Sequence, residues 1–165
     1  MLFDLRKYFS AGVSPSERHL TVDLSGRDFS GARIPQPVEA IFTAVRLADG
    51  IELHLQAQAE IEGVCARCLD PVRQKEEINV VFPVKQRDLD DADFELPLGE
   101  NGALDVEEWV FQEFLFQVPT VLLCSPDCLG LCPVCGKKRQ DCTCQTAAES
   151  TPADARLSIL KSLLN

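Results

Sequence analysis

The sequence predicts an α+β fold in which an antiparallel β-meander carries one packed helix, and three observations support this prediction. Residues 51–62 alternate apolar and polar side chains without a break, the period-two pattern of a strand with one face on a core. A β-rich segment with a turn dipeptide precedes this stretch, and another β-rich segment follows it. A capped, apolar helix pattern lies further along the chain. The expected elements are strands near 38–48, 51–62 and 72–84 and a helix near 105–117.

The segment before the meander is less regular. Residues 1–35 are rich in turn-forming residues and contain one alternating stretch, at 19–24. Between the first two expected strands, Asp49-Gly50 is a dipeptide favoured in two-residue hairpin turns. The last strand follows a Cys-x-x-Cys pair, so Cys65 and Cys68 should lie at the tip between two strands.

The expected helix has clear start and stop signals. Asp105 is a good N-cap, Glu108 stands at the third helical position, and the helix should end before Pro119. Leu104 is placed to pack on Trp109 as a hydrophobic staple. Because the helix is apolar on more than one face, we expect it to pack in the core against the meander. A docking helix for a partner is the alternative.

The C-terminal part is expected to form a short helix after a linker. Asp154 can cap this helix, whose leucines fall at helical spacing. A helix this short is marginal alone, so it should dock on the body of the protein or on another molecule. We expect a single domain, with a core at 18–128, an extension at 124–145, and the linker and C-terminal helix at 146–165.

Composition places the chain among soluble globular proteins. Of its 165 residues, 45% are hydrophobic and 25% are charged, and no apolar run approaches the roughly 20 residues of a membrane helix. Charged residues near the N-terminus stand where a signal peptide would be apolar, so we expect a cytoplasmic protein. The formal net charge of −10 disfavours nucleic-acid binding through the field of the whole protein. A local basic patch or a protein partner is still compatible with this charge.

Acidic residues dominate the middle of the chain. From 88 to 136 there are eleven Asp and Glu residues and no Lys or Arg. A solvated surface is the simpler interpretation of this run, and an acidic surface presented to a basic partner is the other.

The eight cysteines are the strongest chemical signal. In a reducing compartment a dense, regularly spaced set indicates metal ligation before disulfides. Structural zinc takes four ligands, and a Cys-x-x-Cys loop supplies two sulfurs at one edge of the tetrahedron. Two zinc ions would use two sets of four: Cys65, Cys68, Cys124 and Cys128 in one, and Cys132, Cys135, Cys142 and Cys144 in the other.

The two sets differ in reach. The second could close locally, because Pro133 stiffens its first turn and Gly136 gives a permissive backbone after it. Its Cys142-x-Cys144 pair needs a turn for the two sulfurs to converge. The first set would join the tip of the meander to the segment after the helix.

Other interpretations of the cysteines are open. A single zinc ion could use Cys65 and Cys68 with two cysteines from 124–135. Disulfide or redox pairs are a further alternative, although neither Cys-x-x-Cys pair precedes a helical pattern, as a thioredoxin-like pair would.

The sequence lacks other catalytic signatures. Its two histidines, His19 and His54, are expected at solvated positions. A catalytic zinc keeps an open coordination position, whereas all-cysteine sites favour closed, structural zinc. We therefore expect a protein that is not an enzyme.

Four cations accompany the cysteines. Arg67 lies inside the first Cys-x-x-Cys turn, and Lys137, Lys138 and Arg139 lie together between the halves of the second set. On a rigid, metal-stapled loop they could contact phosphate without an ordering penalty. Alternatively, they offset the negative charge of a zinc-thiolate cluster.

Together these residues resemble the YceD family. The resemblance rests on Cys65-Ala-Arg-Cys-Leu69 after a long hairpin, the run from Leu123 through Cys132-Pro-Val-Cys-Gly136, the closing Cys142-Thr-Cys144 and Asp154-Ala-Arg-Leu before a short helix. It covers about 18 to 164, with Ala155 where the family usually has proline. Shorter members keep the first Cys-x-x-Cys without the second motif, which implies two separable sites.

The resemblance implies a role in the accumulation of large-subunit ribosomal RNA through its synthesis, processing or stability. We expect a non-enzymatic, zinc-stapled assembly factor that binds a ribosomal protein or pre-ribosomal RNA, with no membrane and no small-molecule substrate. The alternative is a zinc- or thiol-dependent enzyme of RNA maturation.

Overall fold

The computed structural model describes residues 1–11, 15–91, 94–99 and 101–144. The chain divides into two compact units, one from Met1 to Cys124 and one that begins at Ser125. The expected C-terminal helix and its linker lie outside the described residues, so they stay predictions.

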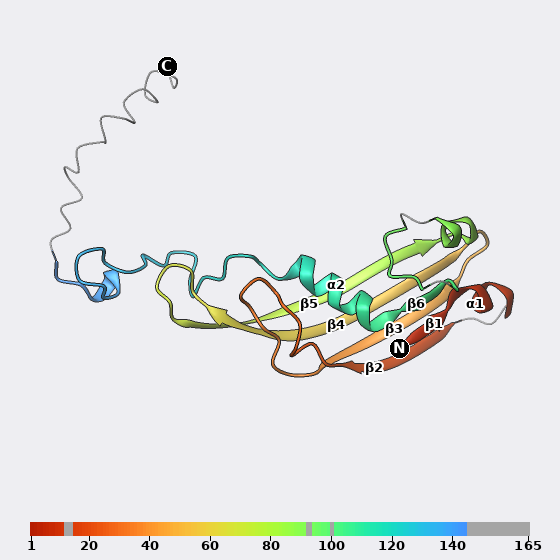
Figure 1. Ribbon diagram of the computed structural model, residues 1–165, viewed down its shortest axis with the longest axis horizontal. Coiled ribbons are helices and arrows are strands. Elements are labelled where there is room, and N and C mark those ends of the chain that lie inside the picture. The colour runs from red at the N-terminus through yellow and green to blue at the C-terminus, as the bar shows by residue number, and fades with distance from the viewer. Residues whose placement is uncertain (12–14, 92–93, 100, 145–165) are drawn as a thin grey trace, which may run out of the picture. The chain divides into compact units, whose positions relative to one another are not determined.

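The first unit is built on a four-stranded antiparallel sheet of order β2-β3-β4-β5 (Figure 1). Its strands are β2 (Ser16–Val22), β3 (Val38–Arg46), β4 (Ile51–Val64) and β5 (Pro71–Val84). The predicted α+β meander is confirmed, and the alternating stretch at 19–24 overlaps an additional strand, β2, which begins and ends earlier. Within the alternating stretch of β4 the apolar positions from Ile51 to Ile61 are buried and Gln56, Gln58 and Glu60 are exposed, as the period-two pattern predicts.

The predicted two-residue hairpin turn is wrong. Arg46 pairs with Ile51, so the loop spans the four residues 47–50, and the Leu47 N–H donates to the Gly50 carbonyl over 2.9 Å. Gly50 serves packing instead: a Cβ at this position would come within 2.6 Å of the Val84 carbonyl oxygen. The end of β5 approaches Gly50 too closely for a side chain, and the sequence around Gly50 gives no sign of this approach.

The N-terminal segment contains two elements that the sequence did not predict. β1 (Leu2–Asp4) pairs with β6 (Ala103–Asp105) in a separate two-stranded sheet, and α1 (Leu5–Ala11) follows it. A short 3₁₀ helix, η1 (Gln86–Asp90), follows β5. Strands of three residues carry too little periodicity to be recognised, and the partner strand lies about a hundred residues away.

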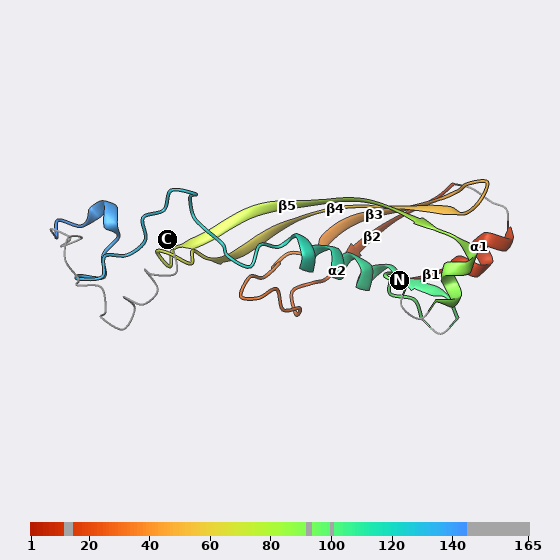
Figure 2. The same ribbon diagram turned by 90° about the horizontal axis from the view of Figure 1, so that it is seen from above.

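The helix α2 (Val106–Gln117) begins where the sequence predicts. The Asp105 side chain accepts hydrogen bonds from the backbone N–H groups of Glu107 and Glu108, as an N-cap does. The helix lies along one side of the sheet (Figure 2).

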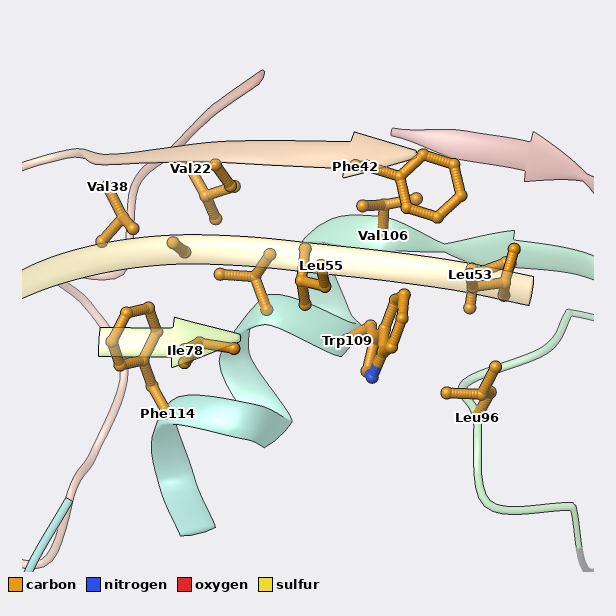
Figure 3. Packing of buried hydrophobic residues seen from close by; sticks show 14 of the residues in the cluster. Val22, Val38, Phe42, Leu53, Leu55, Ile78, Leu96, Val106, Trp109 and Phe114 are labelled. Carbon is orange, nitrogen blue, oxygen red and sulfur yellow. The ribbon is translucent and has the colours of Figure 1, made fainter. Parts of the chain in front are cut away.

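The prediction that α2 packs in the core is confirmed. Trp109 and Phe114 point from the helix toward the strands (Figure 3) and are buried. The rings of Trp109 and Phe42 meet edge to face with centroids 6.3 Å apart. Phe116, at the end of the helix, is 84% exposed.

Among the described residues, no helix combines the length and the apolar character that spanning a membrane requires.

Candidate metal centres

The structure brings the eight cysteines together in the two sets of four that their spacing suggests. Within each set the sulfur atoms all lie within 4.8 Å of one another. None of the eight forms a disulfide. The sets are Cys65, Cys68, Cys124 and Cys128, and Cys132, Cys135, Cys142 and Cys144. We call them the first and the second cluster.

The first cluster begins at the tip of the β4–β5 hairpin. The Leu69 N–H donates to the Cys65 carbonyl over 2.9 Å, and the Cys65 N–H donates to the Asp70 carbonyl over 2.7 Å. The Arg67 N–H points at the Cys65 sulfur, 3.5 Å away. These bonds fold Cys65–Cys68 into a compact turn, the knuckle, which buries both cysteines.

The segment after α2 delivers the third sulfur. The Ala66 N–H donates to the Leu122 carbonyl over 2.9 Å, which fixes the chain two residues before Cys124. Leu122 is buried against Gly63, where a Cβ would lie 2.3 Å from the Leu122 Cδ1 atom. The Cys124 sulfur lies 3.5 Å from that of Cys68. Gly63 and Leu122 therefore position the cluster, although neither is a ligand-type residue.

The second cluster repeats the same knuckle in another sequence. The Gly136 N–H donates to the Cys132 carbonyl over 2.9 Å, and the Cys132 N–H donates to the Lys137 carbonyl over 2.7 Å. The Val134 N–H lies 3.4 Å from the Cys132 sulfur. The residue directly after the second cysteine of each knuckle has a positive φ, 70° at Gly136 and 64° at Leu69.

The Cys142-x-Cys144 pair does converge. A 3₁₀ turn, η2 (Arg139–Asp141), precedes it, and the Cys144 N–H donates to the Cys142 sulfur over 3.2 Å. The Cys142 sulfur lies 3.4 Å from that of Cys135. The backbone thus supplies the turn that this short spacing needs.

The surroundings favour thiolate at one cysteine of each cluster. Hydrogen bonding from the Cys124 backbone lowers the pKa of Cys65 to about 6, and bonding from the Cys135 backbone lowers the pKa of Cys132 to about 6. At Cys142 the Cys144 backbone favours the thiolate, but the sulfurs of Cys132 and Cys135 oppose it and raise the pKa to about 12. Four crowded thiols cannot all ionise without a cation among them.

The donor set fits zinc. Four sulfurs placed tetrahedrally about 2.3 Å from a zinc ion lie roughly 3.8 Å apart, close to the separations in both clusters. A cation of charge +2 would also remove the obstacle to ionising Cys142. All four positions around the ion would then be occupied by thiolate.

The cations predicted to contact phosphate lie on the knuckles. Arg67 is exposed, as are Lys137 and Arg139, and Lys138 is half-buried. The backbone of the three-cation run is fixed, since the Arg139 N–H donates to the Gly130 carbonyl over 2.9 Å. The structure therefore presents Lys137–Arg139 together on a braced loop and Arg67 on the other knuckle.

Many of the acids between 88 and 136 are paired with groups from elsewhere in the chain. Asp90 binds Arg6 over 2.7 Å, Glu107 binds the N-terminal amine over 2.6 Å, and Glu108 binds Arg27. Asp105 caps α2, and the Glu113 carboxylate accepts from the Trp109 indole N–H. Much of the negative charge in this span is therefore used inside the fold.

The sheet, the packed helix and the two clusters define an α+β protein with paired four-thiol centres. The family model described as "Large ribosomal RNA subunit accumulation protein YceD" matches residues 53–164. The chain belongs to the YceD family.

Three curated relatives come from mycobacteria and are themselves described as uncharacterized. They are proteins of Mycobacterium bovis and of two strains of Mycobacterium tuberculosis, each 29% identical over 94 residues, or 54% of this chain. The match covers 45% of each relative, so the chain spans less than half of their length. No solved structure matches.

Proposed function

We propose that the protein is a non-enzymatic ribosome-biogenesis factor of the cytoplasm that supports the synthesis, processing or stability of large-subunit ribosomal RNA. Membership of a family named for the accumulation of that RNA carries the proposal. The two four-thiol clusters support it, because each can hold a zinc ion that braces an exposed loop.

The composition of the clusters favours a structural over a catalytic role. Four thiolates fill the tetrahedron of a zinc ion, which leaves no position for a water molecule or a substrate. A zinc- or thiol-dependent enzyme of RNA maturation is the second candidate, and it would require one cluster to leave a coordination position open for water or substrate.

The proposed partner is a ribosomal protein or pre-ribosomal large-subunit RNA. The internal pairing of Asp90, Glu107 and Glu108 reduces the negative charge available to a basic protein. Arg67, Lys137 and Arg139 are exposed on braced loops, which supports a contact with RNA phosphates.

Depletion and capture test the proposal. In cells that lack the protein, the ratio of large- to small-subunit ribosomal RNA should fall, and the wild-type chain should restore it. A Cys132→Ser/Cys135→Ser variant, which loses the second cluster, should restore it only in part. The tagged wild type should capture immature large subunits, whereas an unchanged RNA ratio together with no capture would refute the proposal.

A separate assay tests the second candidate. The zinc-loaded protein is incubated with a larger molar amount of precursor ribosomal RNA transcript. We expect binding without cleavage. Cleavage of more RNA molecules than protein molecules present would establish the enzyme instead.

A further inference from the structure

Two arginines flank one glutamate across the end of the sheet in the first unit. β4 and β5 extend beyond β2 and β3 at this end (Figure 1). There the segment before β3 takes the vacant edge of β4: Arg33 and Glu62 exchange two backbone N–H···O bonds of 2.9 Å each. On the other side, Glu62 is directly opposite Arg73 of β5. The three residues therefore form one cross-strand row.

The side chains of this row form a shared ion pair. The two Glu62 oxygens bind Arg33 over 3.0 Å and Arg73 over 2.8 Å. The Glu62 side chain is only 15% exposed, whereas the Arg33 and Arg73 side chains are 72% and 70% exposed. One carboxylate thus orients two guanidinium groups that face solvent, and the row keeps a net positive charge. Each guanidinium carries further N–H donors for a ligand.

A hollow of about 490 Å³ lies beside the row. Its lining includes Arg33, Glu62 and Arg73, together with the apolar surface of Val64 and Pro71. Val64 is 57% exposed. The site combines two guanidinium groups with apolar lining residues, and its volume is within the range of small-ligand sites.

We propose that this hollow binds one nucleotide of single-stranded RNA, with its phosphate on Arg33 and Arg73 and its sugar or base on Val64 and Pro71. The inference deepens the proposed function and rests on it. The planar fork of a guanidinium matches the paired oxygens of a phosphate. RNA is read mainly where nucleotides are unpaired and a base can leave the stack, which suits a hollow that offers exposed apolar side chains beside its cations.

The site overcomes the unfavourable charge of the whole chain by being local. With a net charge of −10 the protein cannot attract RNA through its overall field. Glu62 fixes both guanidinium groups before a ligand arrives, which lowers the entropy lost on binding. Sequence reasoning missed the row because Arg33 and Arg73 lie 40 positions apart and meet only through β4.

RNA binding by the full-length, zinc-loaded protein tests the inference. The probe is a short, fluorescently labelled single-stranded RNA, read by anisotropy at several salt concentrations. Arg33→Gln/Arg73→Gln should raise Kd at least about tenfold, and the dependence of log Kd on log salt should fall by about 0.7 per lost phosphate contact. The matched control, Arg18→Gln/Arg87→Gln, removes the same charge from two other exposed arginines and should change Kd less than about twofold.

A pair of lysine substitutions separates the contribution of the guanidinium geometry from that of the positive charge. Arg33→Lys/Arg73→Lys keeps both charges and should restore the salt dependence but only part of the affinity. Equal Kd values for the wild type and the Gln pair, with thermal unfolding showing both folded, would overturn the inference. So would displacement of the RNA by an acidic peptide at the same charge concentration, because the hollow would then serve a protein.

The test also distinguishes this inference from the proposed function. If the wild type captures large-subunit precursors and the folded Gln pair captures them equally well, the nucleotide site is refuted and the proposed function stands. If the wild type neither binds RNA nor captures these precursors, both are refuted.

Discussion

Leu69 and Gly136 occupy the same position of the two knuckles, directly after the second cysteine. Both have a positive φ, and both donate their N–H to the carbonyl of the first cysteine over 2.9 Å. Glycine adopts this conformation without steric penalty, whereas for another L-residue it costs roughly 1–2 kcal/mol. Leu69 is also 64% exposed, so burial of its side chain offers little compensation. The first knuckle therefore holds a strained residue that packing does not explain.

Leu69→Gly should relieve this strain. Glycine also gains entropy in the unfolded chain, and this gain offsets part of the relief. We therefore expect Leu69→Gly to be more stable than Leu69→Ala by about 0.5–1 kcal/mol. The alanine variant is the matched comparison, since it removes the same side chain but keeps the strain. Denaturant unfolding of the zinc-loaded proteins measures the difference, and an alanine variant at least as stable as the glycine variant would contradict the explanation.

At the scale of the elements, the end of the β4–β5 hairpin organises the first cluster. Its turn holds Cys65 and Cys68, and the segment after α2 packs on it through Leu122, next to Gly63. The Asp105 cap and the burial of Trp109 and Phe114 fix where α2 ends, and thus where that segment starts. Strand, helix and knuckle therefore place the cysteines together.

Gly63→Val should disturb the first cluster. Its Cβ would fall 2.3 Å from Leu122, which is buried and must move, so the segment carrying Cys124 should shift with it. We expect a loss of about 1–3 kcal/mol in stability, the range for overpacking, and weaker retention of one metal equivalent during titration with a chelator.

Gly26→Val is the control for this variant, because a Cβ at Gly26 meets nothing within 4 Å. It should leave metal retention unchanged. Equal behaviour of the two variants would show that the contact between Gly63 and Leu122 does not position the cluster.

At the scale of the whole molecule, the two clusters close loops of very different length. Cys68 and Cys124 are 56 positions apart, whereas Cys135 and Cys142 are 7 apart. Loop-closure entropy grows with the logarithm of length, so the longer closure constrains the unfolded chain by about 2 kcal/mol more. The first cluster should therefore contribute more to global stability.

Two zinc ions are expected per chain. Eight cysteines in two sets of four, with sulfurs at separations that suit zinc, support this number. Native mass spectrometry of protein purified without added metal should show two bound ions. A chain with one ion would refute the two-site prediction, and a metal-free chain with four disulfides would refute metal binding altogether.

Loss of one ligand from each cluster should affect stability unequally. Cys65→Ser should lower the midpoint of global thermal unfolding more than Cys142→Ser, because Cys65 belongs to the long closure and is buried. Both variants need their zinc content measured alongside, so that each is known to have lost one ion. Equal midpoints would contradict this partition.

Local signals in the sequence predicted a large part of this structure. Strand β4 follows from twelve alternating residues, α2 from its cap and apolar content, and the composition of the clusters from cysteine spacing. Each of these features repeats or ends within a short stretch of chain. The backbone geometry that produces it therefore depends on neighbouring residues, which the sequence displays directly.

The tertiary structure alone decided the features that join distant segments. The pairing of β1 with β6, the close approach that requires Gly63, and the row of Arg33, Glu62 and Arg73 each depend on residues that lie far apart in the chain. No Lys or Arg lies between positions 88 and 136, yet Arg6 and Arg27 reach acids of this span in the fold. The physical reason is that packing and charge act over ångströms in space, and the sheet sets those distances independently of separation along the chain.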